Sequence, residues 1–269
     1  MEGLYRAMGS GIWNGTEYDA VSGPRFAVGD HLIELAAVRP GEDVLDVGCG
    51  TGELTLKLAC MARPGRVLGV DNEPGMVGVA RNKAAAAGVA NVAFLLRDMR
   101  DLDFAEEFDL AFSNSALQWV WEQERVLAGL FRALRPGGRL ALQFTARDFS
   151  PPLLAALDRV AEEMIPGGPY RDGKYPWYTG DEGYAGLVEV AGFSEVRVWR
   201  KEWPLRFPGA EAAVAFFRAA GLQPYLALLP ETAHEAFCRR LAAELEALCG
   251  QGEMELPFDR LFVTARKQP

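Results

Sequence analysis

The segment 43–52, Asp-Val-Leu-Asp-Val-Gly-Cys-Gly-Thr-Gly, contains the residues whose types and spacing are most suited to chemistry. A short apolar strand ends in a run of glycines and is followed by a segment of helical composition, so bare backbone N–H groups can approach a ligand. Asp46 in this turn would repel a pyrophosphate and attract a cationic amino-acid group. A second acid, Asp71, ends the next apolar strand, where an acceptor for ribose hydroxyls is expected.

The glycine spacing argues against a nicotinamide or flavin site. The dinucleotide fingerprint is G-x-G-x-x-G, and its third glycine allows the helix and strand to pack closely. Here the glycines are Gly48, Gly50 and Gly52, and the sixth position of the pattern is Glu53. The turn therefore suits a nucleoside without a diphosphate, and S-adenosylmethionine is a ligand of this kind.

Several segments, in the same order, resemble the motifs of the class I S-adenosylmethionine-dependent methyltransferases. They are Val44–Gly52, Gly69–Asn72 with Met76, Leu95–Met99, Phe108–Asn114 and Leu134–Leu140. The resemblance implies that Asp71 holds the ribose hydroxyls, that its neighbours flank the adenine, and that Asp98 accepts from the adenine amino group. The cofactor-binding residues expected on this basis are Asp46, Gly48, Cys49, Gly50, Gly52, Asp71, Asn72, Met76, Asp98, Met99, Ser113 and Asn114.

Short apolar runs alternate with helical segments in the first half of the chain, which predicts an α/β fold with a parallel sheet and helices on both faces. Strands are expected at about 43–47, 66–70, 92–96, 109–113 and 139–145. Helices are expected at 31–38, 54–61, 76–87 and 124–134, with Pro136-Gly137-Gly138 ending the last of them. The resemblance implies a Rossmann-like, doubly wound sheet of seven strands, mostly parallel with an antiparallel last strand, plus a helical cap.

After residue 146 the composition changes, and 148–180 is rich in proline, glycine and aromatic residues. Strand character returns at 193–200 and 260–265, and the long connection between them has two helical segments, 208–221 and 231–248. So long a connection is unsuited to a structureless loop, which predicts a helical insertion over the strand ends. The predicted organisation is an N-terminal helical segment over the active site at 1–40, a cofactor-binding core at 41–147, a cap or lid at 148–192, and the last two strands at 193–269 with a cap insertion at about 204–256.

The composition is that of a globular enzyme, with 49% hydrophobic and 24% charged residues. A net charge of −9 and a pI of about 4.9 disfavour a general attraction to nucleic acid or to anionic membranes. Neither a membrane span nor a signal peptide is recognisable, so we expect a cytoplasmic protein. The cysteines lack metal-ligand spacing and no metal site is expected; they are Cys49, Cys60, Cys238 and Cys249. The oligomeric state stays open.

Segments along nearly the whole chain are similar to the trans-aconitate methyltransferase family. They are Ile12–Tyr18 with Ser22 and Arg25, Ser113–Val120, Leu142-Gln143, Ala219–Leu226 and Phe258–Arg266. Insect juvenile-hormone acid methyltransferases and other small-carboxylate methyltransferases are similar in the same places. The resemblance implies methyl transfer to the carboxylate of a small metabolite. The chain departs most from this family at 148–180, on the expected substrate side, so the acceptor's identity is the open part.

A carboxylate acceptor is ionised at neutral pH and needs groups that hold it rather than a general base. Candidate holders are Arg25, Arg260, Arg171 and Lys174, each of which has a surface role as its alternative. Aromatic rings that could line the pocket and favour a sulfonium are Trp13, Tyr18 and Trp119, with core packing as their alternative. Gln143, at the end of an apolar strand, is a candidate hydrogen-bond donor in the pocket or a satisfied buried amide.

Two other functions stay open at this point. A methyltransferase of this fold could act on another hydroxyl, phenol or amine, which would normally need deprotonation. A nucleoside-binding module without transfer activity is the second. Methylation of nucleic acid is disfavoured by the acidic balance, and also because Ser113–Ala116 is not the Asn/Asp-Pro-Pro-Tyr element of amino-directed DNA enzymes.

Overall fold

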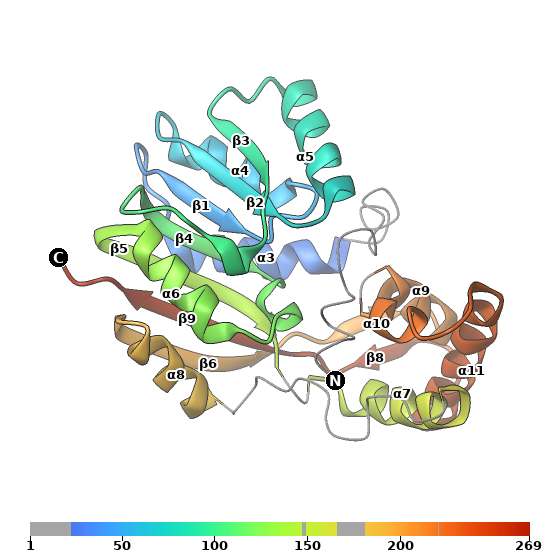
Figure 1. Ribbon diagram of the computed structural model, residues 1–269. Helices are drawn as coiled ribbons and strands as arrows, with labels where there is room; N and C mark the ends of the chain where they lie inside the picture. Colours follow the sequence, from blue (N-terminus) through green and yellow to red (C-terminus); the bar gives the residue numbers. More distant parts are fainter. Residues whose placement is uncertain (1–22, 147–148, 166–180, 220) are drawn as a thin grey trace.

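The computed structural model describes residues 23–146, 149–165, 181–219 and 221–269, and its centre is a seven-stranded sheet (Figure 1). The strands are β1 Val44–Val47, β2 Val67–Asp71, β3 Val92–Leu96, β4 Phe108–Asn114, β5 Leu134–Thr145, β6 Ser194–Glu202 and β9 Asp259–Arg266. Their order is β3-β2-β1-β4-β5-β9-β6; β1 to β5 pair in parallel, and β9 is antiparallel to both neighbours. This arrangement confirms the predicted Rossmann-like fold class.

Helices cover both faces of the sheet. They are α3 Gly23–Ala36, α4 Glu53–Ala62, α5 Pro74–Ala87, α6 Gln123–Ala133 and α8 Asp181–Val190. Successive side chains of a strand point to opposite faces, and β1 is buried along its whole length. Val44 therefore joins the apolar cluster of α3 and α4, whereas Leu45 joins that of α6 and α8. Burial on both faces explains why these strands read as continuous apolar runs.

Two predicted boundaries were wrong. The first helix starts at Gly23, well before residue 31, and ends at Ala36. Strand β5 starts at Leu134, five residues before the predicted 139, because Leu134 pairs with Phe108 on β4. The Pro136-Gly137-Gly138 segment thus lies inside β5 at a register shift, where Gly137 has a φ of 80°. These residues form an irregularity within a strand, and the preceding helix has already ended at Ala133.

A second apolar core lies beside the carboxyl ends of the parallel strands (Figure 1). It is built by α7 Pro151–Met164, α9 Ala210–Arg218, α10 Gln223–Leu226, α11 Glu231–Cys249 and the antiparallel pair β7 Leu205–Phe207 and β8 Met254–Leu256. The rings of Phe149 and Phe258 lie 4.7 Å apart where this unit meets β9. The sequence did not predict β7 and β8. The division into four segments stays a prediction, since 1–40 and 148–192 include residues outside those described.

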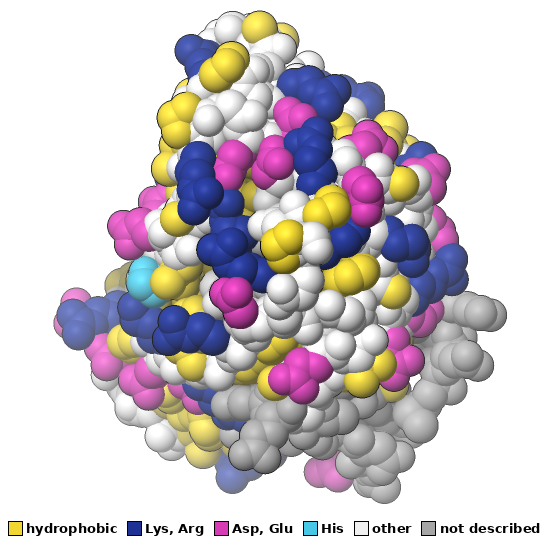
Figure 2. All heavy atoms as spheres, turned by 90° about the vertical axis from the view of Figure 1, so that its left-hand side faces the viewer, with side chains coloured by type: hydrophobic (Ala, Val, Ile, Leu, Met, Phe, Trp, Pro, Cys, Tyr) yellow, Lys and Arg dark blue, Asp and Glu magenta, His cyan; other side chains and the backbone are white. Residues whose placement is uncertain are grey.

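Basic and acidic side chains interleave on the face shown in Figure 2, so the net charge of −9 does not make this side uniformly acidic. At the amino ends of the central strands, Arg135 binds Asp43 at 2.9 Å and Asp109 at 2.7 Å. Burial opposes ionisation of Asp43, but hydrogen bonds from Arg66 and Arg135 outweigh it and lower its pKa to about 2. Within the described ranges, no helix combines the length and apolarity needed to cross a membrane.

Candidate functional site

The glycine turn between β1 and α4 has left-handed backbone at all its glycines, with φ of 71° at Gly48, 53° at Gly50 and 82° at Gly52. A Cβ at Gly48 would collide with the Cβ of Ala116, and one at Gly52 would lie 2.9 Å from the ring of Phe94. Among the described residues, nothing lies within 4 Å of where a Cβ of Gly50 would be. Two glycines therefore permit close packing, whereas Gly50 borders open space in which a ligand can approach the backbone.

Asp71 ends β2 and fixes the glycine turn through backbone hydrogen bonds. One carboxylate oxygen accepts from the Gly50 N–H at 2.9 Å, and the other accepts from the Glu73 N–H at 2.9 Å. Burial raises the pKa of Asp71 despite these bonds. Each oxygen has a further lone pair, so the carboxylate can also accept from hydroxyl groups of a ligand. This position beside Gly50 fits the predicted ribose contact.

Asp46 is buried against α4, with 3% of its surface exposed. The Thr55 hydroxyl donates to its Oδ2 at 2.6 Å. Burial raises the pKa of Asp46 to about 7, and the charge of Asp71 adds to the shift. Glu73, 4% exposed, is a third buried acid near the turn. Such a set of acids favours a ligand with net positive charge; the sequence did not predict the part played by Thr55, three residues after Gly52.

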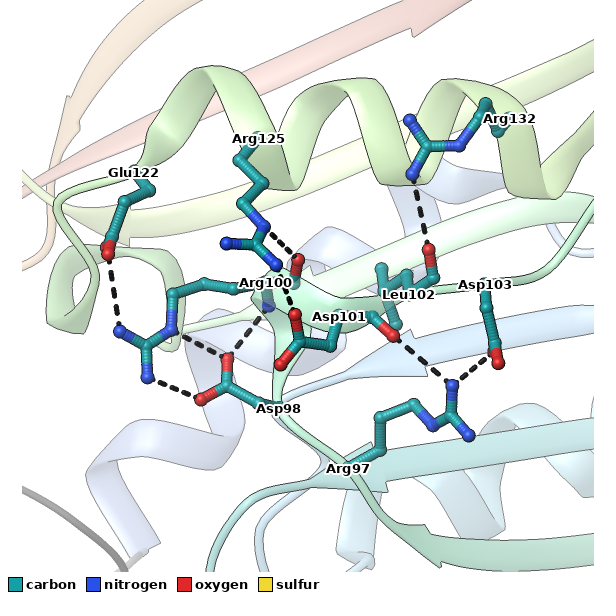
Figure 3. A network of polar contacts seen from close by, with 9 residues as sticks. All are labelled: Arg97, Asp98, Arg100, Asp101, Leu102, Asp103, Glu122, Arg125 and Arg132. Atoms are coloured by element: carbon teal, nitrogen blue, oxygen red, sulfur yellow. Dashed lines mark hydrogen bonds and ion pairs between the residues drawn. The ribbon is translucent and has the colours of Figure 1, made fainter.

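Asp98 opens the short 3-10 helix η1 Met99–Asp101 and is held by Arg100 (Figure 3). Its Oδ1 accepts from the Arg100 backbone N–H at 2.8 Å and from Nε at 2.9 Å, and Oδ2 accepts from Nη2 at 2.6 Å. Burial opposes ionisation, but the Arg100 hydrogen bonds prevail and hold the pKa of Asp98 below its ordinary value. Met99 Cε lies 3.6 Å from where a Cβ of Gly48 would be, so this turn borders the glycine turn.

Ser115 links the carboxyl ends of β4 and β5. Its φ of 57° is unusual for a residue with a side chain, and three contacts hold it there. The Ser115 N–H donates to the Gln143 carbonyl at 2.7 Å, its Oγ donates to Gln143 Oε1 at 3.1 Å, and its carbonyl accepts from Gln118 at 3.0 Å. Ser113, in contrast, is fully buried and donates to the Val47 carbonyl at 2.6 Å, which ties β4 to β1.

Arg260 brings a buried guanidinium to this same point. It lies opposite Thr145 in the β5–β9 register and is 4% exposed. Its Nη1 donates to Ser115 Oγ at 3.3 Å and to Thr145 Oγ1 at 3.1 Å, and its guanidinium lies 4.3 Å from the centre of the Phe258 ring. The neighbouring Gln143 is fully buried, and its Nε2 has no hydrogen-bond acceptor in the described structure. Both side chains are bound to Ser115 Oγ, and a buried guanidinium beside a buried amide suits an anion.

The other predicted residues are less closely tied to this geometry, and their roles stay predictions. Asn72 is exposed, Met76 is 5% exposed within α5, and Cys49 is half-buried beside the Gly50 carbonyl. Asn114 Oδ1 is buried without a hydrogen-bond partner in the described structure, and Trp119 is half-buried at the end of η2 Leu117–Trp119. Predicted residues outside the described part are Trp13, Tyr18, Arg171 and Lys174, and the side chain of Arg25 in α3 is likewise not described.

Neither histidine of the chain lies at these residues. His31 on α3 packs against Trp203 and Phe262, and His234 on α11 contacts the backbone carbonyls of Leu226 and Leu229. In the part of the chain that the structure describes, no three His, Cys, Asp or Glu side chains are grouped so as to hold a metal ion. The described site thus offers hydrogen-bond donors and acids, without an imidazole base.

Comparisons with known proteins identify the family of the chain. The sequence model of the methyltransferase domain family matches residues 39–164. The trans-aconitate 2-methyltransferase of Deinococcus radiodurans is 34% identical over 256 residues, covering 93% of both chains. The enzyme of that name from Escherichia coli is 29% identical over 258 residues, covering 95% of this chain and 98% of its own.

Solved structures show the same fold at low sequence identity. The YcgJ protein of Bacillus subtilis superposes with a TM-score of 0.62 at 17% identity, covering 91% of this chain and 99% of its own. The phosphoethanolamine N-methyltransferase 2 of Haemonchus contortus, in complex with S-adenosyl-L-methionine, superposes with a TM-score of 0.63 at 16% identity. That superposition covers 95% of this chain and 57% of the other. At such identities the likeness concerns the fold alone.

Proposed function

The chain belongs to the trans-aconitate 2-methyltransferase family of S-adenosylmethionine-dependent enzymes, and we propose that it methylates a carboxylate oxygen of a small metabolite. The cofactor is S-adenosylmethionine, and the open question is the acceptor. The relatives from Deinococcus radiodurans and Escherichia coli are named for trans-aconitate, which makes a related di- or tricarboxylate the first acceptor to test.

The observation that carries the carboxylate proposal is the group of donors at the ends of β4, β5 and β9. The Arg260 guanidinium and the Gln143 amide are both buried, and Ser115 Oγ joins them with hydrogen bonds of 3.3 and 3.1 Å. A buried Nε2 without an acceptor has a cost that a bound oxygen anion would relieve. Guanidinium and amide N–H groups match carboxylate oxygens in charge and geometry.

The acidic residues at and near the glycine turn are proposed to bind the cofactor. In this proposal, Asp71 accepts from ribose hydroxyls beside Gly50, and Asp98 accepts from the adenine amino group. Gly50 leaves room for a ligand where a side chain would stand, its N–H being bound to Asp71, and the buried Asp46 adds negative potential. These groups fit a cationic nucleoside, and the fit rests on the open space at Gly50 and on the acid pattern.

When bound, S-adenosylmethionine supplies a methyl group already activated by its positively charged sulfur. The protein then has to orient the acceptor and exclude water, and orientation can contribute much of the rate. A carboxylate is ionised at neutral pH, so no residue has to remove a proton. The partners of the two histidines agree with this, since His31 packs against Trp203 and Phe262 and His234 contacts the backbone carbonyls of Leu226 and Leu229. Arg260 and Gln143 would hold one carboxylate of the acceptor, so that an ionised carboxylate oxygen of the acceptor faces the methyl group.

Labelled methyl transfer tests the acceptor class directly. The purified protein is incubated with methyl-labelled S-adenosylmethionine and with trans-aconitate, other di- and tricarboxylates, fatty acids, phenols or amines. We expect label in carboxylates, in a product that releases methanol in mild alkali, as esters do. With S-adenosylmethionine at saturating concentration at every pH, the rate should be flat between about pH 6 and 9. Transfer only to phenols or amines, with an activity limb near neutrality, would contradict the proposal.

A further inference from the structure

The turn 97–103, which carries Asp98, is bound by arginines from two directions (Figure 3). Arg97 and Arg100 come from the turn itself, and Arg125 and Arg132 reach it from α6. Arg125 Nε donates to the Arg100 carbonyl at 2.7 Å, Arg132 donates to the Leu102 carbonyl at 3.3 Å, and Arg97 donates to the Asp101 carbonyl at 3.2 Å. Further ion pairs join Arg97 to Asp103 and Arg125 to Asp101.

Among these arginines, Arg100 is the one that binds the Asp98 carboxylate in the described structure. A carboxylate has about four positions at which it can accept a hydrogen bond. The Arg100 backbone N–H and Nε occupy Oδ1, and Nη2 occupies one position of Oδ2. One acceptor position on Oδ2 is left, and the carboxylate is partly accessible, with 22% of its side chain exposed. That position suits a single N–H donor.

We propose that Arg100 is a positioning residue that makes the cofactor site selective for a 6-amino purine over a 6-oxo purine. The inference rests on the proposed contact between Asp98 and the adenine amino group. Held by the Arg100 fork, Asp98 presents an oxygen that only accepts. An exocyclic amino group donates to that oxygen, whereas a 6-oxo group would bring a second acceptor against it and be rejected.

Two features of the structure support this role for Arg100. Its Nη1 also binds Glu122 Oε1 at 3.3 Å, so a carboxylate just before α6 holds the far side of the guanidinium. The fork also keeps the pKa of Asp98 low, so Asp98 stays ionised near neutrality. Without Arg100, the Asp98 side chain could rotate, and the site would lose the fixed acceptor that distinguishes an amino group from an oxo group.

Calorimetric titration with S-adenosylhomocysteine and S-inosylhomocysteine tests the proposal. The proteins are the wild type, Arg100→Ala, Arg100→Lys and the matched control Arg125→Ala. Arg125 lies on α6 and binds the same turn, but it makes no hydrogen bond to Asp98 in the described structure. We expect the wild type to prefer the adenosyl ligand by at least about 100-fold. Arg100→Ala should reduce this preference by about tenfold or more, and Arg100→Lys by less because it keeps the charge without the fork. Arg125→Ala should keep the preference within about twofold.

The outcomes separate the inference from the proposed cofactor contacts. If Arg100→Ala keeps the full preference for the adenosyl ligand, the proposed role of Arg100 is overturned. It is also overturned if Arg100→Ala and Arg125→Ala lose this preference equally, because the effect would then come from the rigidity of the turn as a whole. If Arg100→Ala does not fold, Arg100→Lys replaces it in the comparison, and an undiminished preference in Arg100→Lys would overturn the proposal. A wild type that binds both ligands equally would instead refute the Asp98 contact, and the inference with it. The acceptor proposal would be unaffected by any of these results.

Discussion

Asp71→Asn is the substitution that most clearly separates cofactor binding from folding. Asp71 accepts backbone hydrogen bonds from Gly50 and Glu73, both at 2.9 Å, one on each carboxylate oxygen. Asparagine has the same shape but only one oxygen, so one of the two N–H groups would face an amide donor. An orphaned buried donor costs about 1–3 kcal/mol. Since these bonds do not need a ligand, this cost should appear in the free energy of unfolding.

The cofactor should show a separate loss. In the proposed site the Asp71 carboxylate accepts from ribose hydroxyls, and hydrogen bonds to a charged group contribute about 1.5–3 kcal/mol. Replacing the carboxylate by an amide should therefore weaken S-adenosylhomocysteine binding by about 10- to 150-fold. Calorimetry measures this Kd, and denaturant unfolding measures the stability change on the same protein.

Asp109→Asn is the matched control, because Asp109 lies at the amino end of the sheet and binds Arg135. It should change the Kd by less than about twofold, while any effect on stability is small. An unchanged Kd in a folded Asp71→Asn protein would remove Asp71 from the cofactor site. A stability loss without an affinity loss would give Asp71 only the role of pinning the glycine turn, and would refute the ribose contact.

The remaining predictions concern the acceptor, pH and stability. Arg260→Ala should raise the acceptor KM at least about tenfold and change the cofactor Kd less than about twofold; equal effects in kinetics and calorimetry would indicate a structural role. Burial raises the pKa of Asp46 to about 7, so Asp46 becomes negatively charged between about pH 6 and 8 and affinity for the net-positive cofactor should increase over this range. Asp46→Asn should flatten this trend. A pH-independent wild-type Kd would contradict the prediction. Arg135→Ala should lower the free energy of unfolding by about 1 kcal/mol near pH 7. The pKa of Asp43 is lowered to about 2, so its contribution is present above about pH 4 and lost as the pH falls toward 2; a difference between wild type and variant that persists at pH 2 would contradict the pairing.

The sheet and the glycine turn could be predicted because their physics is local in sequence. A strand buried on both faces needs an apolar run, as in β1, and backbone with positive φ favours glycine, as at Gly48, Gly50 and Gly52. Asp71 could be placed because it is the last residue of the apolar strand β2. Element boundaries were less predictable: β5 begins at Leu134 because of its pairing with Phe108, which the order of residues does not reveal.

The partners of the site residues were not predictable in the same way. Ser115 and Arg260 are 145 residues apart, and their contact depends on β9 inserting next to β5. Thr55 binds Asp46 because α4 packs back on β1, and nothing in the residue type marks it. Arg100 is only two residues from Asp98, but its fork depends on the conformation of η1. Such pairings come from register and turn geometry rather than from composition.

The most direct test of the central claim is a crystal structure of the protein with S-adenosylhomocysteine and trans-aconitate. The proposal predicts one acceptor carboxylate within hydrogen-bond distance of Gln143 Nε2 and the Arg260 guanidinium, and ribose hydroxyls on Asp71. A carboxylate bound elsewhere, with Gln143 Nε2 still without an acceptor, would contradict the assignment of Gln143 and Arg260 as the groups that bind the carboxylate.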